Sequence, residues 1–276
     1  MIHLPRTTGL LPAYNPRVAF VYAHRGGAKL RPENTILAFD YGLALGAGGL
    51  EFDVRLSRDG AVVVHHDATL ERTTNGAGAV SAHTADELAR LDAGYHFGPP
   101  AHPFRGLTGG VPRLDDVLRR YPDARCIIEL KENEPELAHR AIEVVRAAGA
   151  VDRVALGSFG TRVLHAARAQ EPRIPTGASR EETRLALYRS WVRWPVRRPA
   201  YREFQVPEVS GSTRVVSPRF VRYAREANVR VAVWTVDAAE DISRLFDWGV
   251  DGIITDRPDV AVPIARARHA RASGLS

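Results

Sequence analysis

The stretch from Val21 to Asp67 reads VYAHRGGAKLRPENTILAFDYGLALGAGGLEFDVRLSRDGAVVVHHD and decides the fold. Three short apolar runs lie in it or at its edge, at residues 18–23, 50–56 and 61–66, and histidine or carboxylate side chains lie within or directly after each run. Runs of β-branched and aromatic residues bounded by glycine are typical of buried strands. The stretch therefore predicts neighbouring strands that bring charged side chains to a shared end.

A helix and a tight turn connect these runs. Asn34 or Thr35 can cap a helix that continues to about Leu45, where glycines follow. Asp59 and Gly60 form a turn pair that favours a hairpin. We therefore expect the third run to pair antiparallel with the second.

Beyond residue 111, short apolar runs alternate with amphipathic segments. The expected strands cover residues 126–130, 154–157, 174–177, 204–206, 229–236 and 252–255. The expected helices cover residues 134–148, 161–170, 181–191, 218–227 and 238–248. This alternation indicates βαβ units, and 276 residues suit one α/β barrel of the (β/α)8 TIM type, which takes about 250. A doubly wound open sheet is the alternative, but HRGGAKLRPENT is not the glycine-rich phosphate loop that such a sheet usually carries.

Two segments depart from the alternation within this single domain of residues 1–276. Residues 68–111 are rich in Thr, Pro and Gly, and only residues 84–91 have a helical pattern. Because the segment is too long for a simple loop, we expect a small inserted subdomain after the third strand. The basic tail at residues 264–276 is expected to be poorly ordered.

Composition is that of a globular protein, with 45% apolar and 25% charged residues. No apolar run approaches the roughly 20 residues that span a bilayer, and the N-terminus lacks the layout of a secretory signal. The lone Cys126 fits a reducing compartment, so the cytoplasm is the expected location. The net charge of +6 does not indicate nucleic acid, because the arginines are spread through nearly every expected helix and no nucleic-acid-binding motif accompanies them.

Glu51 and Asp53 are two residues apart, so on a strand their side chains lie on the same face. Adjacent carboxylates repel each other unless a cation or proton lies between them, and Ca²⁺ and Mg²⁺ favour carboxylate oxygens. Glu129 lies in an apolar strand, where a buried acid needs a partner, and Lys131 shares its face. Glu51 and Asp53 considered alone could instead be ordinary surface charges on a solvated face of the strand. Together the four residues predict a site for a cation and a phosphate.

Two histidines lie at the ends of different runs. His24 follows the first, and His66 ends the third. His65 and His66 point to opposite faces of a strand, so only one reaches the site, and we choose His66 because it ends the run. Either histidine could instead be a buried core residue. Together they would supply the base and the acid for a phosphodiester displacement. Arg25 has a planar fork suited to phosphate oxygens, with a surface salt bridge as the alternative.

These residues lie in motifs that resemble the glycerophosphodiester phosphodiesterase family. The motifs are HRG at 24–26, PENT at 32–35, EFDV at 51–54, VVVHHD at 62–67, LERTTNG at 70–76, VPRLDDVL at 111–118, IIELKE at 127–132, VWTVD at 233–237 and GVDGIITDRPD at 249–259. They occur in the family's order. Ser57 stands where the family often has Thr, and residues 180–208 match no family motif.

The resemblance implies a (β/α) barrel with the inserted subdomain and metal-dependent hydrolysis of small glycerophosphodiesters. The products would be glycerol 3-phosphate and an alcohol, formed through a cyclic phosphate, with direct attack by water as the alternative. One divalent cation, Ca²⁺ or Mg²⁺, would be held by the residues that match the family's ligands: Glu51, Asp53 and Glu129. The remaining implied roles are acid and base for His24 and His66, phosphate binding for Arg25 and Lys131, and an aromatic cleft wall for Trp234.

Two other functions are weighed against this one. A lysophospholipase D-like enzyme would act at membranes through weak contacts of residues 188–201, where Trp191, Trp194 and Tyr201 alternate with arginines. Packing of the tryptophans on the barrel, with the arginines solvated, is the alternative for this tract. A non-catalytic phosphoester-binding protein would have lost a ligand or a histidine, and none is lost. The residues do not decide the alcohol, the cation, which histidine is the first base or the oligomeric state.

Overall fold

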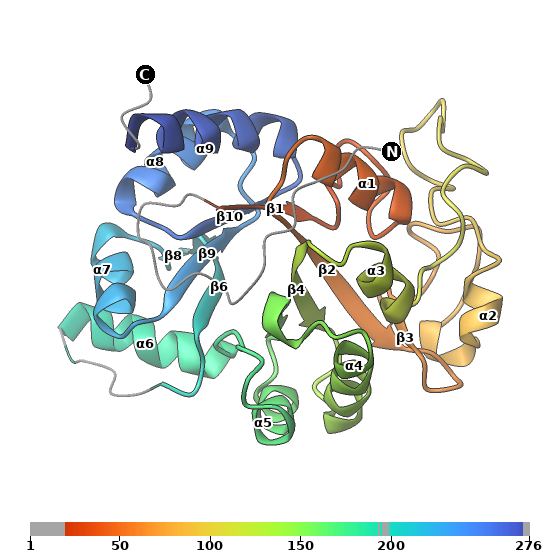
Figure 1. The fold of residues 1–276 in the computed structure, drawn as a ribbon, viewed down its shortest axis with the longest axis horizontal. Coiled ribbons are helices and arrows are strands. Elements are labelled where there is room, and N and C mark those ends of the chain that lie inside the picture. The colour runs from red at the N-terminus through yellow and green to blue at the C-terminus, as the bar shows by residue number, and fades with distance from the viewer. Residues whose placement is uncertain (1–19, 193, 195–198, 273–276) are drawn as a thin grey trace.

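The computed structural model describes residues 20–192, 194 and 199–272, in which strands and helices alternate (Figure 1). The strands are β1 (Phe20–His24), β2 (Gly49–Leu56), β3 (Val62–Val64), β4 (Arg125–Leu130), β5 (Val154–Gly157), β6 (Glu203–Pro207), β7 (Val209–Ser210), β8 (Thr213–Arg214), β9 (Arg230–Trp234) and β10 (Gly252–Thr255). The helices are α1 (Ile36–Ala44), α2 (Ala85–Leu88), α3 (Leu114–Arg120), α4 (Pro135–Ala147), α5 (Thr161–Gln170), α6 (Arg180–Val192), α7 (Pro218–Glu226), α8 (Ala239–Trp248) and α9 (Pro258–Ala272). Two 3₁₀ turns are η1 (Val80–Ala82) and η2 (Val151–Arg153).

The strands form a nearly closed parallel barrel. Their order is β5-β4-β2-β1-β10-β9-β6, and β3 is added antiparallel to β2, as the Asp-Gly turn predicted. Thr176 forms a parallel bridge with Leu156 of β5, and Gly177 forms one with Glu203 of β6. These bridges link the two ends of the sheet and replace the strand expected at 174–177. The predicted TIM-type barrel is confirmed, with its helices arranged around the outside of the strands (Figure 1).

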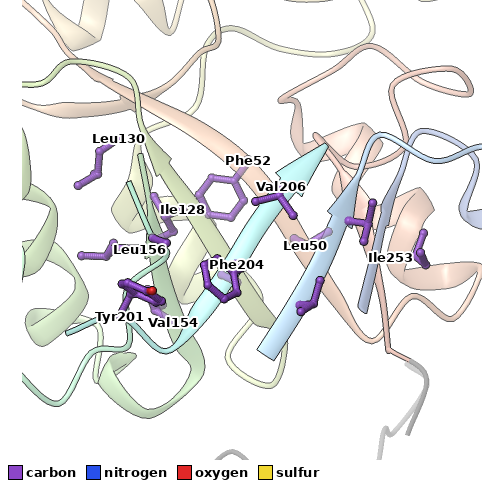
Figure 2. Packing of buried hydrophobic residues seen from close by; sticks show 14 of the residues in the cluster. Leu50, Phe52, Ile128, Leu130, Val154, Leu156, Tyr201, Phe204, Val206 and Ile253 are labelled. Carbon is purple, nitrogen blue, oxygen red and sulfur yellow. The ribbon is translucent and has the colours of Figure 1, made fainter. Parts of the chain in front are cut away.

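Each strand has an outer and an inner face. Leu50, Phe52 and Val54 are fully buried in the main core, where the Phe52 ring lies 5.4 Å from the ring of Phe39 in α1. Figure 2 shows Leu50 and Phe52 among the apolar side chains of neighbouring strands. A second cluster from five strands fills the barrel interior: Tyr22, Ile127, Ala155, Ala232 and Ile254. Because side chains alternate along a strand, outward Leu50 and Phe52 send Glu51 and Asp53 inward.

The segment between β3 and α3 contains η1, α2 and several turns. Its helix is shorter than the expected 84–91. Thr84 caps it with a capping box: its side chain accepts from the Glu87 backbone N–H, and the Glu87 carboxylate accepts from the Thr84 backbone N–H. A small apolar cluster holds the segment against the barrel: Val63, Leu70, Val80, Ala85, Leu88 and Val111.

Helix α1 begins as predicted, because the Thr35 hydroxyl accepts a hydrogen bond from the backbone N–H of Ala38. The poorly ordered tail predicted from residue 264 is wrong for residues 264–272, which belong to α9. Val262 and Ala265 are buried in the main core and Ile264 packs against it, so the helix is anchored by apolar contacts. Residues 273–276 of that tail lie outside the described part. Among the described helices, none is both long and apolar enough to cross a bilayer.

Asp251, directly before β10, gives the fold a pH dependence. Its carboxylate accepts a hydrogen bond from the Val231 backbone N–H at 2.8 Å, and burial raises the pKa of Asp251 to about 6. The folded protein therefore binds the proton more tightly than the unfolded chain does. The protonated Asp251 carboxyl therefore stabilises the folded state. This stabilisation is complete below about pH 4 and is lost as the pH rises through 6.

We expect Asp251→Asn to keep an oxygen that accepts the hydrogen bond from the Val231 backbone N–H. The variant should not lose stability as the pH rises through 6, because its side chain does not ionise. The free energy of unfolding of the variant, minus that of the wild type, should rise by about 2 kcal/mol between pH 4 and pH 7. Urea denaturation at both pH values measures this difference in the free energy of unfolding. Asp123→Asn, which removes one carboxylate from an exposed position, is the control. A difference that is equal at both pH values would contradict the prediction.

Candidate active site

The candidate site lies where the carboxyl ends of the barrel strands meet. Strand pairing places His24 beside Glu51 and Asp53 beside Glu129, although these residues belong to three separate strands. One cavity of about 790 Å³ opens there. Its walls include seven of the eight residues predicted from the sequence: His24, Arg25, Glu51, His66, Glu129, Lys131 and Trp234. The eighth, Asp53, lies behind them and is fully buried.

Three carboxylates converge at the base of this cavity. One oxygen each from Glu51, Asp53 and Glu129 lies within 4.8 Å of the others. Burial raises the pKa of Glu51 to about 8, and the charges of Asp53 and Glu129 add to the rise. Burial also raises the pKa of Glu129. The cluster therefore favours a proton or a cation between its members.

The donors of this cluster fit a hard divalent cation. Glu51 Oε2 and Glu129 Oε1 are buried and have no hydrogen-bond partner among the described residues. Buried polar atoms without partners are rare, because each costs the free energy of its lost hydration. Carboxylate oxygens are the ligands that Ca²⁺ and Mg²⁺ prefer. The three acids could therefore hold such a cation.

Asp53 is held as a carboxylate by cations on both sides. Burial opposes its ionisation, but Arg25 and Lys131 lower the pKa of Asp53 to about 2. Arg25 Nε lies 3.1 Å from Asp53 Oδ2, and Lys131 Nζ lies 3.0 Å from Asp53 Oδ1 and 3.1 Å from Glu129 Oε2. Asn34 donates to Asp53 Oδ2 at 2.9 Å. Asn34 is not among the predicted site residues, although it lies in the PENT motif.

The loop after β1 explains how Arg25 reaches the acids. Gly26 has φ +89°, and a Cβ atom there would lie 2.6 Å from Ala38, so glycine allows α1 to pack directly on the loop. The Arg25 backbone N–H donates to the Glu51 carbonyl at 2.6 Å, which ties the loop to β2. The Arg25 guanidinium also contacts Glu33 at 2.8 Å. Arg25 is therefore paired with acids, but inside the cavity rather than on the surface.

His24 is oriented by a carboxylate from the far end of the chain. Its Nδ1 donates to Asp256 Oδ1 at 2.6 Å, and its Nε2 lies 3.7 Å from Glu51 Oε2. Burial favours the neutral ring, but Glu51 and the hydrogen bond to Asp256 outweigh it and raise the pKa of His24. Asp256 is not among the predicted site residues. The available signal was a carboxylate directly after the last strand.

His66 has a similar arrangement. Its Nδ1 donates to Asp67 Oδ1 at 2.6 Å, and Arg72 holds Asp67 in turn. Burial lowers the pKa of His66. His65 turns away from the cavity, and its Nε2 donates to the Thr69 carbonyl at 3.0 Å. The choice of His66 over His65 thus agrees with the geometry. With Nδ1 protonated, each neutral site histidine presents Nε2 as the atom that can accept a proton.

The carboxylate cluster predicts how metal affects stability. We expect Ca²⁺ or Mg²⁺ to raise the melting temperature of metal-stripped wild type and to leave that of Glu51→Gln nearly unchanged, because a ligand that binds only the folded state stabilises it. Without metal, Glu51→Gln should melt no lower than wild type, because it removes like-charge repulsion. Differential scanning calorimetry measures both effects. Exposed Glu134→Gln is the control, and a full metal shift in Glu51→Gln would refute the ligand assignment.

Comparison with known proteins finds relatives of this chain both in sequence and in structure. A profile of the glycerophosphoryl diester phosphodiesterase family matches residues 24–260. A glycerophosphodiester phosphodiesterase of Caldanaerobacter subterraneus subsp. tengcongensis is 33% identical over 251 residues, which cover 89% of this chain and 97% of that protein.

Solved structures show the same fold. The glycerophosphodiester phosphodiesterase of Agrobacterium tumefaciens matches with a TM-score of 0.74 at 29% identity, over 89% of this chain and 99% of that one. An Oleispira antarctica phosphodiesterase, solved with the product sn-glycerol-3-phosphate, matches with a TM-score of 0.74 at 23% identity, over 90% and 97% of the two chains. The chain therefore belongs to the glycerophosphoryl diester phosphodiesterase family and is a hydrolase of glycerophosphodiesters.

Proposed function

We propose that the chain hydrolyses small glycerophosphodiesters to glycerol 3-phosphate and an alcohol, with a divalent cation and two histidines. The observation that carries this proposal is the convergence, in one cavity, of three carboxylates and two carboxylate-oriented histidines. The product found in the Oleispira antarctica structure supports the choice of glycerol 3-phosphate.

Glu51, Asp53 and Glu129 would hold the cation. When bound, it would supply positive charge that polarises the phosphodiester and stabilises negative charge in the transition state. Arg25 and Lys131 line the same cavity and add fixed positive charge beside the acids. Their N–H groups can donate to phosphate oxygens as well as to Asp53, so they would bind and orient the phosphate.

The histidines would move the protons. One Nε2 accepts the proton of the glycerol 2-hydroxyl as that oxygen attacks phosphorus, and the other histidine donates a proton to the departing alcohol oxygen. The product of this step is a cyclic glycerophosphate. Water then opens the ring with the two roles reversed, which restores both histidines. Asp256 holds His24 and Asp67 holds His66, so each ring keeps Nε2 directed at the reacting atoms.

The test is release of glycerol 3-phosphate from sn-glycero-3-phosphoethanolamine. Metal-stripped protein should be inactive, and Ca²⁺ or Mg²⁺ should restore turnover. His66→Ala should lower kcat by about a thousandfold, because a lost acid or base costs about 10² to 10⁴ in rate. His83→Ala is the matched control, since the exposed hydrogen bond of the His83 side chain to the Ala77 carbonyl lies outside the cavity.

Circular dichroism checks that both variants fold. A His66→Ala variant with wild-type turnover would overturn the proton-transfer role of His66. Full activity after metal removal would overturn the metal dependence while leaving the substrate class intact. Transient cyclic phosphate, detected by ³¹P NMR, separates attack by the 2-hydroxyl from direct attack by water.

A second candidate is a lysophospholipase D-like activity at membrane surfaces. Trp191 is 52% exposed and Trp194 is 65% exposed, and Tyr188 and Val192 beside them are more than half exposed. More than half of the surface of each tryptophan is thus exposed, whereas Tyr201 is buried. Residues 193 and 195–198 of this tract lie outside the described part. Exposed aromatic residues beside a cavity that binds phosphodiesters favour contact with lipid.

Co-sedimentation with phosphatidylglycerol vesicles tests this candidate. The wild type should bind, and Trp191→Ser/Trp194→Ser should bind at least about threefold more weakly, because membrane affinity scales with the apolar area inserted. Leu107→Ser, which alters a 66% exposed apolar residue elsewhere, is the control. Absence of wild-type binding, together with no release of lysophosphatidic acid from lysophosphatidylcholine, would exclude the membrane function.

A further inference from the structure

The active-site cavity extends well beyond the histidines and the acids. Its far wall is built by α6 and by the short hairpin β7–β8, neither of which carries a residue of the proposed catalytic machinery. Four residues of α6 line this wall: Arg180, Thr183, Arg184 and Leu187. A phosphate bound near Arg25 and Lys131 would leave this part of the cavity for a substituent of the phosphate. The alcohol moiety of the substrate is that substituent.

The far wall carries an unbalanced positive charge. Arg180 and Arg184 are one helical turn apart, so they lie on the same side of α6. The acidic residues that line the cavity, Glu51 and Glu129, belong to the strand ends and not to this wall. Neither Arg180 nor Arg184 is in an ion pair with any residue that the structure describes.

The two glutamates between these arginines have other partners. Glu182 pairs with Arg168 at 2.7 Å and accepts a hydrogen bond from the Ser179 backbone N–H. Glu181 accepts a hydrogen bond from the Thr161 hydroxyl at 2.6 Å. The hydrogen bond from Thr161 and, to a smaller extent, the charge of Arg184 lower the pKa of Glu181, but no ion pair joins the side chains of Arg184 and Glu181. The guanidinium groups of both α6 arginines can therefore contact a ligand.

The aromatic residues between the two ends of the cavity do not offer an open cation site. Phe159 and Trp234 meet edge to face, with ring centroids 5.9 Å apart. The Arg180 guanidinium carbon lies 5.2 Å from the centroid of the Phe159 ring. A quaternary ammonium group is bound through open aromatic faces. Here the protein's own guanidinium takes that position on Phe159 and would repel such a group.

We propose that Arg180 and Arg184 form a subsite for an alcohol moiety that carries an anionic group. The inference rests on the proposed hydrolysis of glycerophosphodiesters and specifies their class. A guanidinium fork pairs with the two oxygens of a carboxylate or the oxygens of a phosphate, so the favoured substrates carry one of these groups on the alcohol. Phosphodiesters of purely cationic alcohols, such as choline and ethanolamine, are disfavoured.

Two substrates that differ by one carboxylate test the subsite. They are sn-glycero-3-phosphoserine and sn-glycero-3-phosphoethanolamine, each assayed by release of glycerol 3-phosphate. We expect kcat/KM of the wild type to favour the serine ester by about tenfold, the effect of one charge-assisted hydrogen bond, mainly through KM. The preference should shrink as salt rises, because the far wall is exposed to solvent.

Variants assign the preference to the arginines. Arg180→Gln/Arg184→Gln should reduce the ratio to within about twofold of unity, and Arg180→Lys/Arg184→Lys should retain part of it, because lysine keeps the charge but loses the fork. Arg219→Gln/Arg222→Gln removes the same charge from exposed positions of α7 outside the cavity and should keep the wild-type ratio. If the double glutamine variant does not fold, Arg184→Gln alone should lower the ratio.

Three outcomes would overturn the inference. These are a wild-type ratio near unity, a preference for the ethanolamine ester, and a serine preference that survives in a folded glutamine variant. If the wild type hydrolyses both esters equally, the subsite fails and the proposed function stands. If it hydrolyses neither in the presence of Ca²⁺ or Mg²⁺, the proposed function fails and the subsite with it.

Discussion

The structure depends on one electrostatic constraint, which is the burial of three carboxylates side by side at the mouth of the barrel. Asp53 and Glu129 are paired residues of adjacent strands, so their side chains cannot separate without a shift in strand register. Lys131 contacts both of them, and Arg25 and Asn34 contact Asp53. These contacts balance the charge of Asp53, while buried oxygens of Glu51 and Glu129 have no hydrogen-bond partner among the described residues. The three carboxylates therefore need a proton or a cation to balance their charge. For the same reason the site can bind a cation.

The apolar face of the same strands holds the acids in this arrangement. Leu50, Phe52 and Val54 are fully buried against the helices, and a shift of β2 by one residue would turn them into the barrel interior and place Glu51 and Asp53 among the apolar side chains under the helices. Such a shift would cost several kcal/mol, because each carboxylate would be buried without a cation or a hydrogen-bond donor. Packing thus fixes the register, and the register places the charges.

The cavity combines two kinds of wall with separate origins. The strand ends supply the acids, His24 and Lys131, and β1, β2 and β4, which carry or precede these residues, are each paired with a strand on both sides. Helix α6 and the β7–β8 hairpin supply the far wall, and α6 belongs to residues 180–208, which match no family motif. Because the far wall is separate from the strand ends, the residues that bind the alcohol can differ from those that carry out the reaction.

The sequence by itself determined the repeating units and indicated most residues of the candidate site. Alternation within Leu50–Leu56 placed Glu51 and Asp53 on one face, the Asp59-Gly60 turn identified the antiparallel third strand, and Thr35 marked the start of α1. These features depend on local periodicity and local hydrogen bonds, which a short window of sequence contains. The roles assigned to the site residues remain predictions, although the structure brings the residues together.

Only the tertiary structure decided which distant residues meet. Asp256 and His24 are 232 residues apart, and no local pattern connects them. The strand expected at 174–177 became two single bridges, and α9 continued through residues expected to be poorly ordered, because contacts with the barrel outweigh local propensity there. The exposure of Trp191 and the position of Arg180 and Arg184 at the cavity also depend on how α6 packs. Burial and electrostatic balance arise from neighbours in space, and the folded barrel alone determines those neighbours.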